Sequence, residues 1–269
     1  MRSLQVEQLT TQFSHAPRGE QPRSDRSRPS GSWRRMDAAH LPPAACQSDL
    51  AELTIAAVRS LLTALELRDA YTLAHCQRVA RIACDLASSL GLSELACQEI
   101  YLAGILHDIG KLGIPEAVLG KTGPLSNDEF KLIQRHPEQG YLLVEPLTPL
   151  QCALPGILYH HERPDGRGYP HGLSGEGIPI MARVLAVADA YDAMTSRRSY
   201  RQPQPPAEVL ARLVAGSGYQ WDAAIVRCFE QTVRDRTTAE RAPQTLLGSI
   251  DPQDSPVGYV HQAVMAVSH

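Results

Sequence analysis

The pair His160-His161 lies in the most chemically informative stretch of the chain, residues 159–170, which reads YHHERPDGRGYP. Adjacent histidines are rare outside metal sites, because burying two imidazoles without a metal leaves polar groups unpaired, at a cost on the order of a few kcal/mol. Further nitrogen and oxygen donors stand elsewhere in the chain, at His75, His107, Asp108, His136 and Asp189. Together these side chains suffice to bind two metal ions, and they indicate metal-dependent phosphodiester hydrolysis.

Some of these donors, taken alone, also have an ordinary structural explanation. His75 lies on a helical pattern whose neighbours at i+4 and i+7 are apolar, and a histidine there is more often a core residue with satisfied hydrogen bonds. The His107-Asp108 pair follows the apolar segment 100–106, where such a pair commonly caps a helix or lies at the surface. A helix end with imidazole next to carboxylate also suits a pair of metals, because a carboxylate can bridge two cations.

His136 and Asp189 differ in how strongly their surroundings indicate a metal. His136 stands directly before Pro137, so it is predicted to close a helix, where a polar or positive side chain complements the helix dipole. Asp189 interrupts the largely apolar segment 183–188, where a lone buried carboxylate would be costly. A bound cation would remove that cost, and also the cost of burying the histidine pair.

The elements that must position these residues are predicted to be helices. Two apolar stripes recur with helical spacing. The first consists of Leu50, Leu53, Ala57, Leu61 and Leu65, and the second of Val79, Ile82, Ala83 and Leu86. No segment shows the strict alternation of a strand, so the core is predicted to be all-α.

Local signals indicate where these helices begin and end. Gly91 stands in the C-terminal cap position of the second helix, and Ser93 opens the next one. Ser126 and Glu129 form a capping box in front of an apolar run. Pro179 stands where the first turn of the helix that carries the downstream aspartate should begin.

One core of moderate size is predicted, at residues 49–235 of the 269-residue chain. Residues 1–48 are rich in arginine, serine, proline and glutamine and have few large apolar side chains, so this N-terminal segment is predicted to be disordered. Residues 236–269 are polar again, and the apolar stretch 260–267 within them is too short to support a domain. They are predicted to form a C-terminal tail.

The overall composition excludes several classes of protein. The formal net charge of −3 gives no electrostatic reason to expect binding to duplex nucleic acid. The six cysteines show no CxxC spacing, which indicates free thiols in a reducing cytoplasm. No stretch approaches about 18 uninterrupted apolar residues, so neither a membrane span nor a secretory leader is expected. A cytoplasmic protein is predicted.

Two short motifs carry a resemblance to a known family. Residues 107–111 read HDIGK and residues 168–170 read GYP. They resemble the signatures of HD-GYP domains, a branch of the HD phosphohydrolase superfamily. The resemblance covers roughly residues 50–232, in the family's order, through residues 65–69, 113–115, 121–125, 135–138 and 189–196. It implies an all-α HD-domain helical bundle and hydrolysis of cyclic di-GMP, a bacterial second messenger.

The resemblance also implies a set of metal ligands. One divalent ion would be held by His75, His107, Asp108 and Asp189, and Asp108 would bridge to a second ion held by His136, His160 and His161. Imidazole and carboxylate ligands permit Fe, Mn, Zn or Ni, and the family favours Fe or Mn. The two ions would activate a water for in-line attack on phosphorus, and Lys111 would stabilise the charge that develops.

The number of ions is expected to be two because of one departure from the family's pattern. Some relatives bind a third ion through a glutamate four residues before the first histidine, on the same helix face. This chain has Tyr71 at that position. Two ions suffice to open one phosphodiester, so linear pGpG is the expected main product and its further hydrolysis to GMP is expected to be slow or absent.

Residues 197–201 are the expected substrate loop. The segment departs from the family's pattern at its first and third positions, where an acid and a proline are common. Arg198 and Arg201, together with Lys111, are the expected contacts to phosphate or guanine.

Gly168, Tyr169 and Pro170 are expected to bind a partner, and the alternative that Tyr169 stacks on a guanine of the substrate stays open. The neighbouring glycines permit a sharp turn and the proline limits flexibility, so the tyrosine ring is predicted to be presented at the surface beside the metal cleft. Tyrosines often anchor protein interfaces, and the resemblance suggests a GGDEF-domain protein as the partner. A homodimer is a further expectation.

Two other interpretations of the domain stay open. In the first, it is a catalytically idle receptor or interaction module that binds a GGDEF-type partner, and the complete ligand set argues against this. In the second, it is an HD enzyme that acts on another nucleotide, such as cyclic GMP-AMP, and the GYP motif argues against that. Metal analysis combined with product analysis on cyclic di-GMP would discriminate among them.

Overall fold

The fold is built from helices alone in the part of the chain that the structure describes. The computed structural model describes residues 44–196 and 202–239. Within these two ranges there is no β-strand, and the strand-like pairings are the isolated bridges Asp165–Ser174 and Ser217–Trp221. The predicted all-α fold is confirmed.

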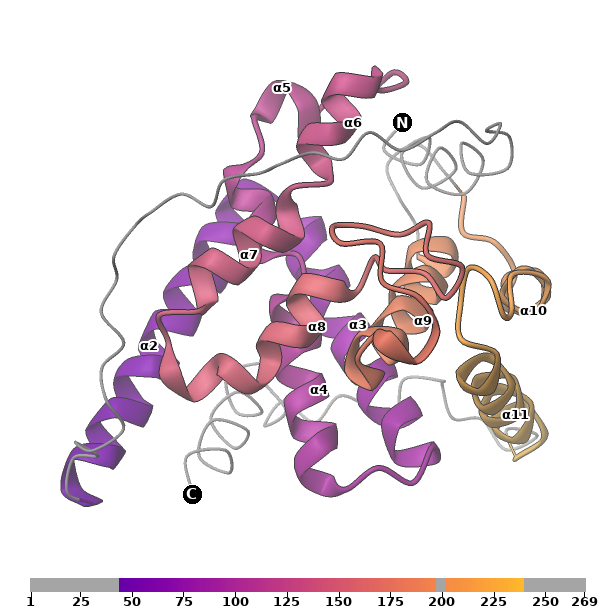
Figure 1. The fold of residues 1–269 in the computed structure, drawn as a ribbon, viewed down its shortest axis with the longest axis horizontal. Coiled ribbons are helices and arrows are strands. Elements are labelled where there is room, and N and C mark those ends of the chain that lie inside the picture. Colours follow the sequence, from indigo (N-terminus) through magenta and orange to yellow (C-terminus); the bar gives the residue numbers. More distant parts are fainter. Residues whose placement is uncertain (1–43, 197–201, 240–269) are drawn as a thin grey trace.

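The order of the helices can be followed in Figure 1. The α-helices are α2 (Ala44–Arg68), α3 (Ala70–Ser89), α4 (Glu94–Leu106), α5 (Glu116–Leu119), α6 (Asn127–Ile133), α7 (His136–Val144), α8 (Leu154–Tyr159), α9 (Ile180–Thr195), α10 (Pro206–Ala215) and α11 (Ala223–Ala239). Short 3-10 helices lie between them at η2 (Ile109–Gly113), η3 (Thr148–Ala153) and η4 (Gly175–Gly177). Among the described helices, none is long and apolar enough to cross a membrane.

Three sequence predictions concern residues that lie largely or wholly outside the described ranges. Most of the predicted disordered segment 1–48 and of the predicted tail 236–269 lies outside the described residues, and for those residues both stay predictions. Helix α2 begins at Ala44 and α11 ends at Ala239, so the helices extend a few residues past both predicted boundaries. The expected substrate contacts Arg198 and Arg201 also lie outside them.

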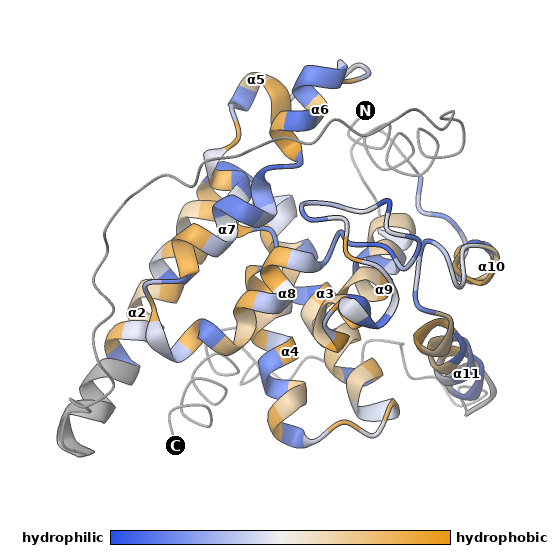
Figure 2. Ribbon diagram, viewed as in Figure 1, coloured by the Kyte–Doolittle hydropathy of each residue, from blue (hydrophilic) through white to orange (hydrophobic). Residues whose placement is uncertain are grey.

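The core is organised around α3, which packs against both α4 and α9. Helix α8 packs against the same two helices, and α11 packs against α3. Figure 2 shows α11 with its hydrophobic side turned toward the rest of the molecule and its hydrophilic side turned away. The largest fully buried side chains include Leu86, Ile100, Leu106, Ile157 and Leu185. Their burial removes apolar surface from water and thereby fixes the mutual positions of the helices that carry the candidate ligands.

The local signals for helix ends predicted the boundaries correctly. Gly91 follows α3 with a φ of 76°, a conformation that glycine adopts without strain. The Ser93 side chain accepts a hydrogen bond from the backbone of Ala96 at the start of α4. The capping box of Ser126 and Glu129 is present in full. These signals depend only on neighbouring residues, which explains why the sequence predicts them so well.

The apolar stripe predicted for the first helix is wrong in most of its described members. Leu53 is 68% exposed, Ala57 and Leu61 are partly buried, and Leu65 is the one member in the core. The buried side of α2 consists instead of Ile55, Val58, Leu62 and Leu65. Helix α2 carries apolar residues on two sides, and its packing against α3 and η2 decides which side is buried.

The prediction that His136 closes a helix is also wrong. Helix α6 ends at Ile133, and His136 is the first residue of α7. Pro137 lies in the first turn of α7, where its missing N–H has no partner to lose. The proline therefore opens the following helix and does not terminate the preceding one.

Helices α5 and α6 form a hairpin that protrudes from the rest of the fold (Figure 1). The hairpin has a small hydrophobic cluster, separate from the main core, that contains Ile114, Val118, Leu125, Phe130 and Ile133. The guanidinium of Arg68, at the end of α2, donates hydrogen bonds to the backbone carbonyls of Leu112 and Ile114. The base of the hairpin is thus tied to the first helix of the core.

Candidate metal centre

The predicted metal ligands come from separate helices and meet at one place in the fold. His75 lies in α3, residues 107–108 follow α4, His136 opens α7, residues 160–161 follow α8, and Asp189 lies in α9. All of them except His107 line a single pocket. His107 is buried, and its ring centroid lies 5.5 Å from that of His75 and 5.0 Å from that of His160. The structure therefore brings together every assigned ligand position.

The Asp108 carboxylate lies between two groups of histidines. Its Oδ2 atom is 3.9 Å from Nε2 of His75 and 3.5 Å from Nε2 of His107. Its Oδ1 atom is 3.4 Å from Nε2 of His136. Because the two oxygens face different imidazoles, this carboxylate has the geometry required of a ligand shared by two cations.

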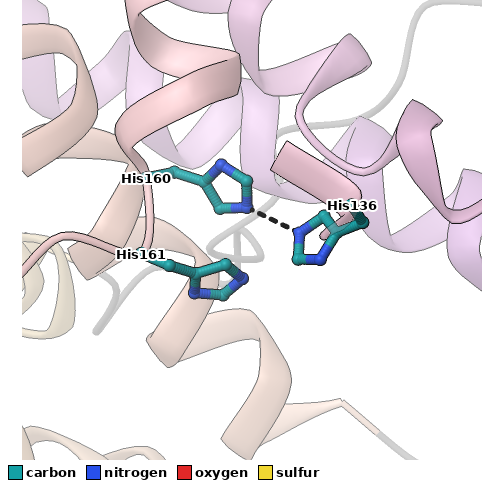
Figure 3. A group of neighbouring side chains, drawn as sticks. All are labelled: His136, His160 and His161. Atoms are coloured by element: carbon teal, nitrogen blue, oxygen red, sulfur yellow. Dashed lines mark hydrogen bonds between the residues drawn. The ribbon is translucent and has the colours of Figure 1, made fainter. Parts of the chain in front are cut away.

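His136, His160 and His161 form the second group, and Figure 3 shows their rings turned toward one another. The Nδ1 atom of His136 lies 2.8 Å from a backbone carbonyl oxygen, and that of His160 lies 2.9 Å from another. Since a carbonyl only accepts hydrogen bonds, both Nδ1 atoms carry the proton. The two Nε2 atoms, which are 3.1 Å apart, are then both acceptors without a proton between them.

His107 shows the same arrangement in the first group. Its Nδ1 atom donates to the backbone carbonyl of Gly104 at 2.7 Å, so its Nε2 atom is also an acceptor. That Nε2 atom is buried and has no hydrogen-bond partner. Unprotonated, buried Nε2 atoms that face one another and a carboxylate need a cation to balance them, so the donor set fits bound metal.

The protonation states of the second group also fit metal binding. Burial lowers the pKa of His136 to about 3 and the pKa of His161 to about 4. Burial also lowers the pKa of His160, well below its usual value. A histidine must be neutral to bind a metal, and these imidazoles are neutral at physiological pH.

His75 is held differently, by a carboxylate that the sequence analysis did not single out. Its Nδ1 atom is 2.7 Å from Asp192, which also accepts hydrogen bonds from Arg78 at 2.6 Å and 3.0 Å. Its Nε2 atom is 3.0 Å from Asp189. Burial opposes protonation of His75, but the hydrogen bonds to the two aspartates outweigh it and raise its pKa to about 9. Asp192 stands three residues after Asp189 on a helix, and that spacing is the signal that could have identified it.

Lys111 forms an ion pair with the shared carboxylate, with its Nζ atom 2.5 Å from Asp108 Oδ2. Burial alone would raise the pKa of Asp108, but Lys111 and His107 hold that pKa well below its usual value. Burial would lower the pKa of Lys111, but Asp108 raises it above its usual value. Both groups therefore stay charged, and the ammonium lies where it can act on an anion bound beside the carboxylate.

Cys76 is a buried thiol beside the first group. Its sulfur lies within 4.8 Å of donor atoms of His107 and Asp108. Burial, with a further contribution from Asp108, raises its pKa well above the usual value. The thiol is therefore protonated in the metal-free protein.

The expectation that Tyr169 presents its ring at the surface is wrong. The residue is buried, with 9% of its surface exposed. Its ring stacks on the ring of His161, with centroids 4.7 Å apart and an angle of 28° between the planes. Burial raises the pKa of its hydroxyl, as do the carboxylates of Asp108 and Asp189, so this hydroxyl stays protonated. The ring lines the pocket from the side of the second histidine group.

The loop that carries Tyr169 is packed tightly against the backbone after α8. A Cβ atom on Gly168 would lie 2.4 Å from the backbone nitrogen of Arg163 and 2.6 Å from the carbonyl oxygen of His161, so glycine is required there. The backbone N–H of Tyr169 donates to that same carbonyl oxygen at 3.2 Å. The buried carboxylate of Glu162 accepts a hydrogen bond from the backbone of the residue after Pro170, His171, at 2.7 Å. Through these contacts the GYP sequence fixes the backbone that directly follows the histidine pair.

The walls of the pocket extend well beyond the ligands. One wall comes from the α5–α6 hairpin, through Leu119, Phe130 and Ile133, and another contains Arg163, Arg167 and Trp221. The two arginines are basic residues that the sequence analysis did not assign to the site. Tyr71, which replaces the third-metal glutamate, also lines the pocket, and its ring lies parallel to that of His75 at 6.4 Å.

Comparison with known sequences adds an independent observation. The sequence profile of a family described as HD domain matches residues 59–225. The cyclic di-GMP phosphodiesterase response regulator RpfG of Xanthomonas campestris is 42% identical over 183 residues, which are 67% of this chain and 48% of that protein. A cyclic di-GMP phosphodiesterase of Thermotoga maritima is 39% identical over 178 residues, 65% of this chain and 48% of that protein. The chain thus spans about half the length of these curated relatives.

Other relatives are named for a different cyclic dinucleotide. The 3′3′-cGAMP-specific phosphodiesterase 2 of Vibrio cholerae is 37% identical over 180 residues, 66% of this chain and 34% of that protein. Among solved structures, the cyclic GMP-AMP-specific phosphodiesterase V-cGAP3 of V. cholerae superimposes with a TM-score of 0.54 at 22% identity, over 82% of this chain and 60% of that one. Bd1817 of Bdellovibrio bacteriovorus superimposes with a TM-score of 0.51 at 19% identity, over 71% of this chain and 63% of that one. At these identities the two structures show a shared fold.

Proposed function

The chain belongs to the HD domain family, in its HD-GYP branch, and on this premise we propose that it is a metal-dependent phosphodiesterase that opens cyclic di-GMP to linear pGpG. One observation carries the proposal: the Asp108 carboxylate separates two groups of histidines. The Nε2 atoms of His107 and His136, which face it from the two groups, carry no proton, because the Nδ1 atom of each ring donates to a backbone carbonyl. A carboxylate so placed suits a pair of cations that act together on one phosphodiester.

We assign two divalent ions to the site, with Fe or Mn as the favoured metals and Zn or Ni as permitted ones. The first would be held by His75, His107, Asp108 and Asp189, and the second by Asp108, His136, His160 and His161. A third ion is not part of the proposal, because the aromatic side chain of Tyr71 lines the pocket where some relatives carry a carboxylate.

Each side chain of the site has a distinct part in the proposed reaction. Bound ions would activate a water for attack on phosphorus and neutralise the phosphoryl oxygens. Asp108 would be a ligand shared by both ions, and Asp192 orients the ring of His75. Lys111 places its ammonium beside the shared carboxylate, where it stabilises negative charge on the phosphoryl group in the transition state.

The test is product analysis on metal-reconstituted protein. Cyclic di-GMP and 3′3′-cyclic GMP-AMP are supplied in parallel, and the products are separated by chromatography while the metal is counted by elemental analysis. We expect two ions per chain, accumulation of pGpG, and a higher kcat/KM for cyclic di-GMP. Turnover of neither dinucleotide, or rapid GMP without a pGpG intermediate, would contradict the proposal.

A second candidate function is hydrolysis of 3′3′-cyclic GMP-AMP, because relatives named for that substrate are 34% to 37% identical to this chain. A higher kcat/KM for that dinucleotide in the same experiment would favour it. A GGDEF-domain partner, a homodimer and a cytoplasmic location stay predictions. Since the ring of Tyr169 is buried, it is not the anchor of such a partner contact.

Metal binding should depend on pH through His75. Its raised pKa of about 9 means that the metal-free protein carries a proton there at neutral pH, and an ion must displace it. We expect the affinity for Mn²⁺, measured by chelator competition, to rise about tenfold per unit between about pH 7 and 9 and then to level off. Asp192→Asn removes one cause of the raised pKa and should flatten this dependence. An affinity that is constant from pH 7 to 9 in the unaltered protein would contradict the assignment.

The same shift has an opposite consequence for the stability of the metal-free protein. A pKa that is higher in the folded chain than the usual 6.5 stabilises the fold where the group is protonated in both states. This contribution is complete below about pH 6.5 and is lost as the pH rises through about 9. The thermal midpoint of the metal-free protein should therefore fall over that interval, while metal affinity rises.

Lys111→Ala should lower kcat by roughly 10²-fold, as expected for the loss of one charge-stabilising donor. The metal content should be unchanged, because a lysine is not a ligand. Elemental analysis and initial rates on the same preparation test this, with Lys131→Ala as the control, since Lys131 is an exposed lysine paired with Asp128 at 3.1 Å. If Lys111→Ala loses its ions as well, the lysine supports the ligand set and has no separate role in turnover.

A further inference from the structure

Gln220 places a neutral side-chain amide in the pocket, on a wall that carries no candidate ligand. The residue lies in the turn between α10 and α11 (Figure 1), and it lines the same pocket as Asp108. Its amide forms no hydrogen bond with another residue that the structure describes. An amide has both a donor and an acceptor, and both lose their hydrogen bonds with water when a ligand fills the pocket. The best complement to this wall is therefore a group with an acceptor next to a donor.

The turn that carries Gln220 is held rigidly on the core. The backbone N–H of Gln220 donates to the carbonyl of Gly216 at 2.9 Å, and that of Trp221 donates to the same carbonyl at 3.2 Å. The Trp221 ring packs so closely on Gly216 that a Cβ added to the glycine would lie 2.3 Å from it. The next residue, Asp222, pairs with Arg183 of α9 at 2.7 Å. A ligand thus gains the hydrogen bonds of the amide without first ordering the turn.

The charges in the pocket assign different parts of a nucleotide to different walls. Phosphate oxygens are anionic acceptors, and the cationic side chains of Lys111, Arg163 and Arg167 line the pocket and can donate to them. A neutral amide would leave its own carbonyl unpaired against a phosphate. The Watson–Crick edge of guanine has the O6 acceptor next to the N1–H donor, which matches the NH₂ and C=O of the amide. Gln220 therefore fits the base of a guanine nucleotide better than its phosphate.

We propose that the Gln220 amide donates to O6 and accepts from N1–H of one guanine base of the substrate, and that it is thereby a specificity-determining residue. The inference rests on the proposed function, since it assumes that a guanine nucleotide binds with its phosphodiester at the candidate ligands. The amide makes no contact with the reacting atoms, so it affects only ligands that carry a base. A pair of hydrogen bonds between an amide and a base edge discriminates by about 10-fold to 100-fold.

Gln220→Leu removes the amide and keeps a side chain of similar size. Because Gln220 is partly buried and its amide bonds to no described residue, the substitution should leave the metal content and the thermal midpoint unchanged. Gln231→Leu is the matched control, because it makes the same chemical change at an exposed residue of α11.

The experiment compares ligands with and without a base on the metal-reconstituted whole chain. The affinities for GMP and for ribose 5-phosphate are measured by calorimetry, and kcat/KM for cyclic di-GMP and for bis(p-nitrophenyl) phosphate by initial rates. For Gln220→Leu we expect GMP affinity and kcat/KM for cyclic di-GMP to fall about 10-fold to 100-fold. The values for the two ligands without a base should stay within about twofold. Gln231→Leu should stay within about twofold in all four measurements.

The outcomes separate this inference from the proposed function. If Gln220→Leu stays within about threefold for GMP and for cyclic di-GMP, the amide does not bind the base and the inference is wrong. It is also wrong if ribose 5-phosphate and the aryl substrate lose as much as the guanine ligands, because the amide then acts on the phosphate or supports the whole site. If the unaltered protein cleaves no cyclic dinucleotide, the proposed function fails, and the affinities for GMP and ribose 5-phosphate still decide the role of Gln220.

Discussion

Asp108→Asn should lower the turnover of cyclic di-GMP by roughly 10³-fold or more, which corresponds to the several kcal/mol that metal ions contribute to such transition states. Asparagine keeps the shape of the side chain and removes its charge. The carboxylate is 3.5 Å from His107 on one side and 3.4 Å from His136 on the other, so the change weakens the binding of both ions at once. It also leaves the ammonium of Lys111 without its counterion. We expect both the rate and the metal content to collapse together.

Elemental analysis, initial rates and a thermal scan of the same preparation test this expectation. Asp128→Asn is a suitable control, because it makes the same chemical change at an exposed carboxylate on α6 that pairs with Lys131. The control should match the unaltered protein in all three measurements. An Asp108→Asn protein that retains two ions per chain and more than a tenth of the rate would show that the carboxylate is not a shared ligand.

Gly110→Ala should destabilise the protein by about 3 kcal/mol or more, although it adds only one methyl group. The added Cβ would lie 1.9 Å from the backbone oxygen of His136 and 2.4 Å from the backbone nitrogen of Gly140. Both contacts are with backbone atoms, so no side chain can rotate away and α7 must shift as a unit. Since His136 is the first residue of α7, the shift displaces a candidate ligand as well. Stability and metal binding should therefore be lost together.

The expected change in the thermal midpoint is a fall of roughly 6 to 12 °C for a domain of this size. Gly123→Ala is the matched control, because nothing lies within 4 Å of a Cβ added there. It should change the free energy of unfolding by no more than about 0.5 kcal/mol. A Gly110→Ala protein with an unchanged midpoint would mean that η2 and α7 are further apart than the structure places them.

The sequence predicted those parts of the fold that depend on short-range interactions. The capping box at Ser126 and the glycine after α3 could be identified from neighbouring residues, and both are present. The buried side of α2 could not, because apolar residues lie on two of its sides and only contacts with distant segments choose between them. The prediction that His136 closes a helix was wrong for a related reason. A proline such as Pro137 is compatible both with the end of one helix and with the first turn of the next.

In the candidate site, the ligands could be predicted from the sequence, but the residues that orient them could not. Each assigned ligand is a residue type with metal chemistry of its own, so the set could be listed before its members were known to meet. The partners that orient those ligands were harder to predict. Asp192 had to be recognised as facing α3 across the core, and the burial of Tyr169 depends on how its loop packs on His161. Both are consequences of tertiary packing, which no local pattern encodes.

Some histidines of the centre are oriented by backbone carbonyls and one by a side chain, so the two halves of the centre differ in how well they tolerate mutation. His107, His136 and His160 each bond to a backbone carbonyl three residues earlier, and a main-chain oxygen is supplied by any amino acid at that position. His75 depends on the side chain of Asp192, so a single substitution of that residue removes the hydrogen bond that orients its ring. Mutational drift should therefore damage the half of the centre that carries His75 first, and inactive descendants of this protein should be recognisable by changes at Asp192 that leave the other histidines in place.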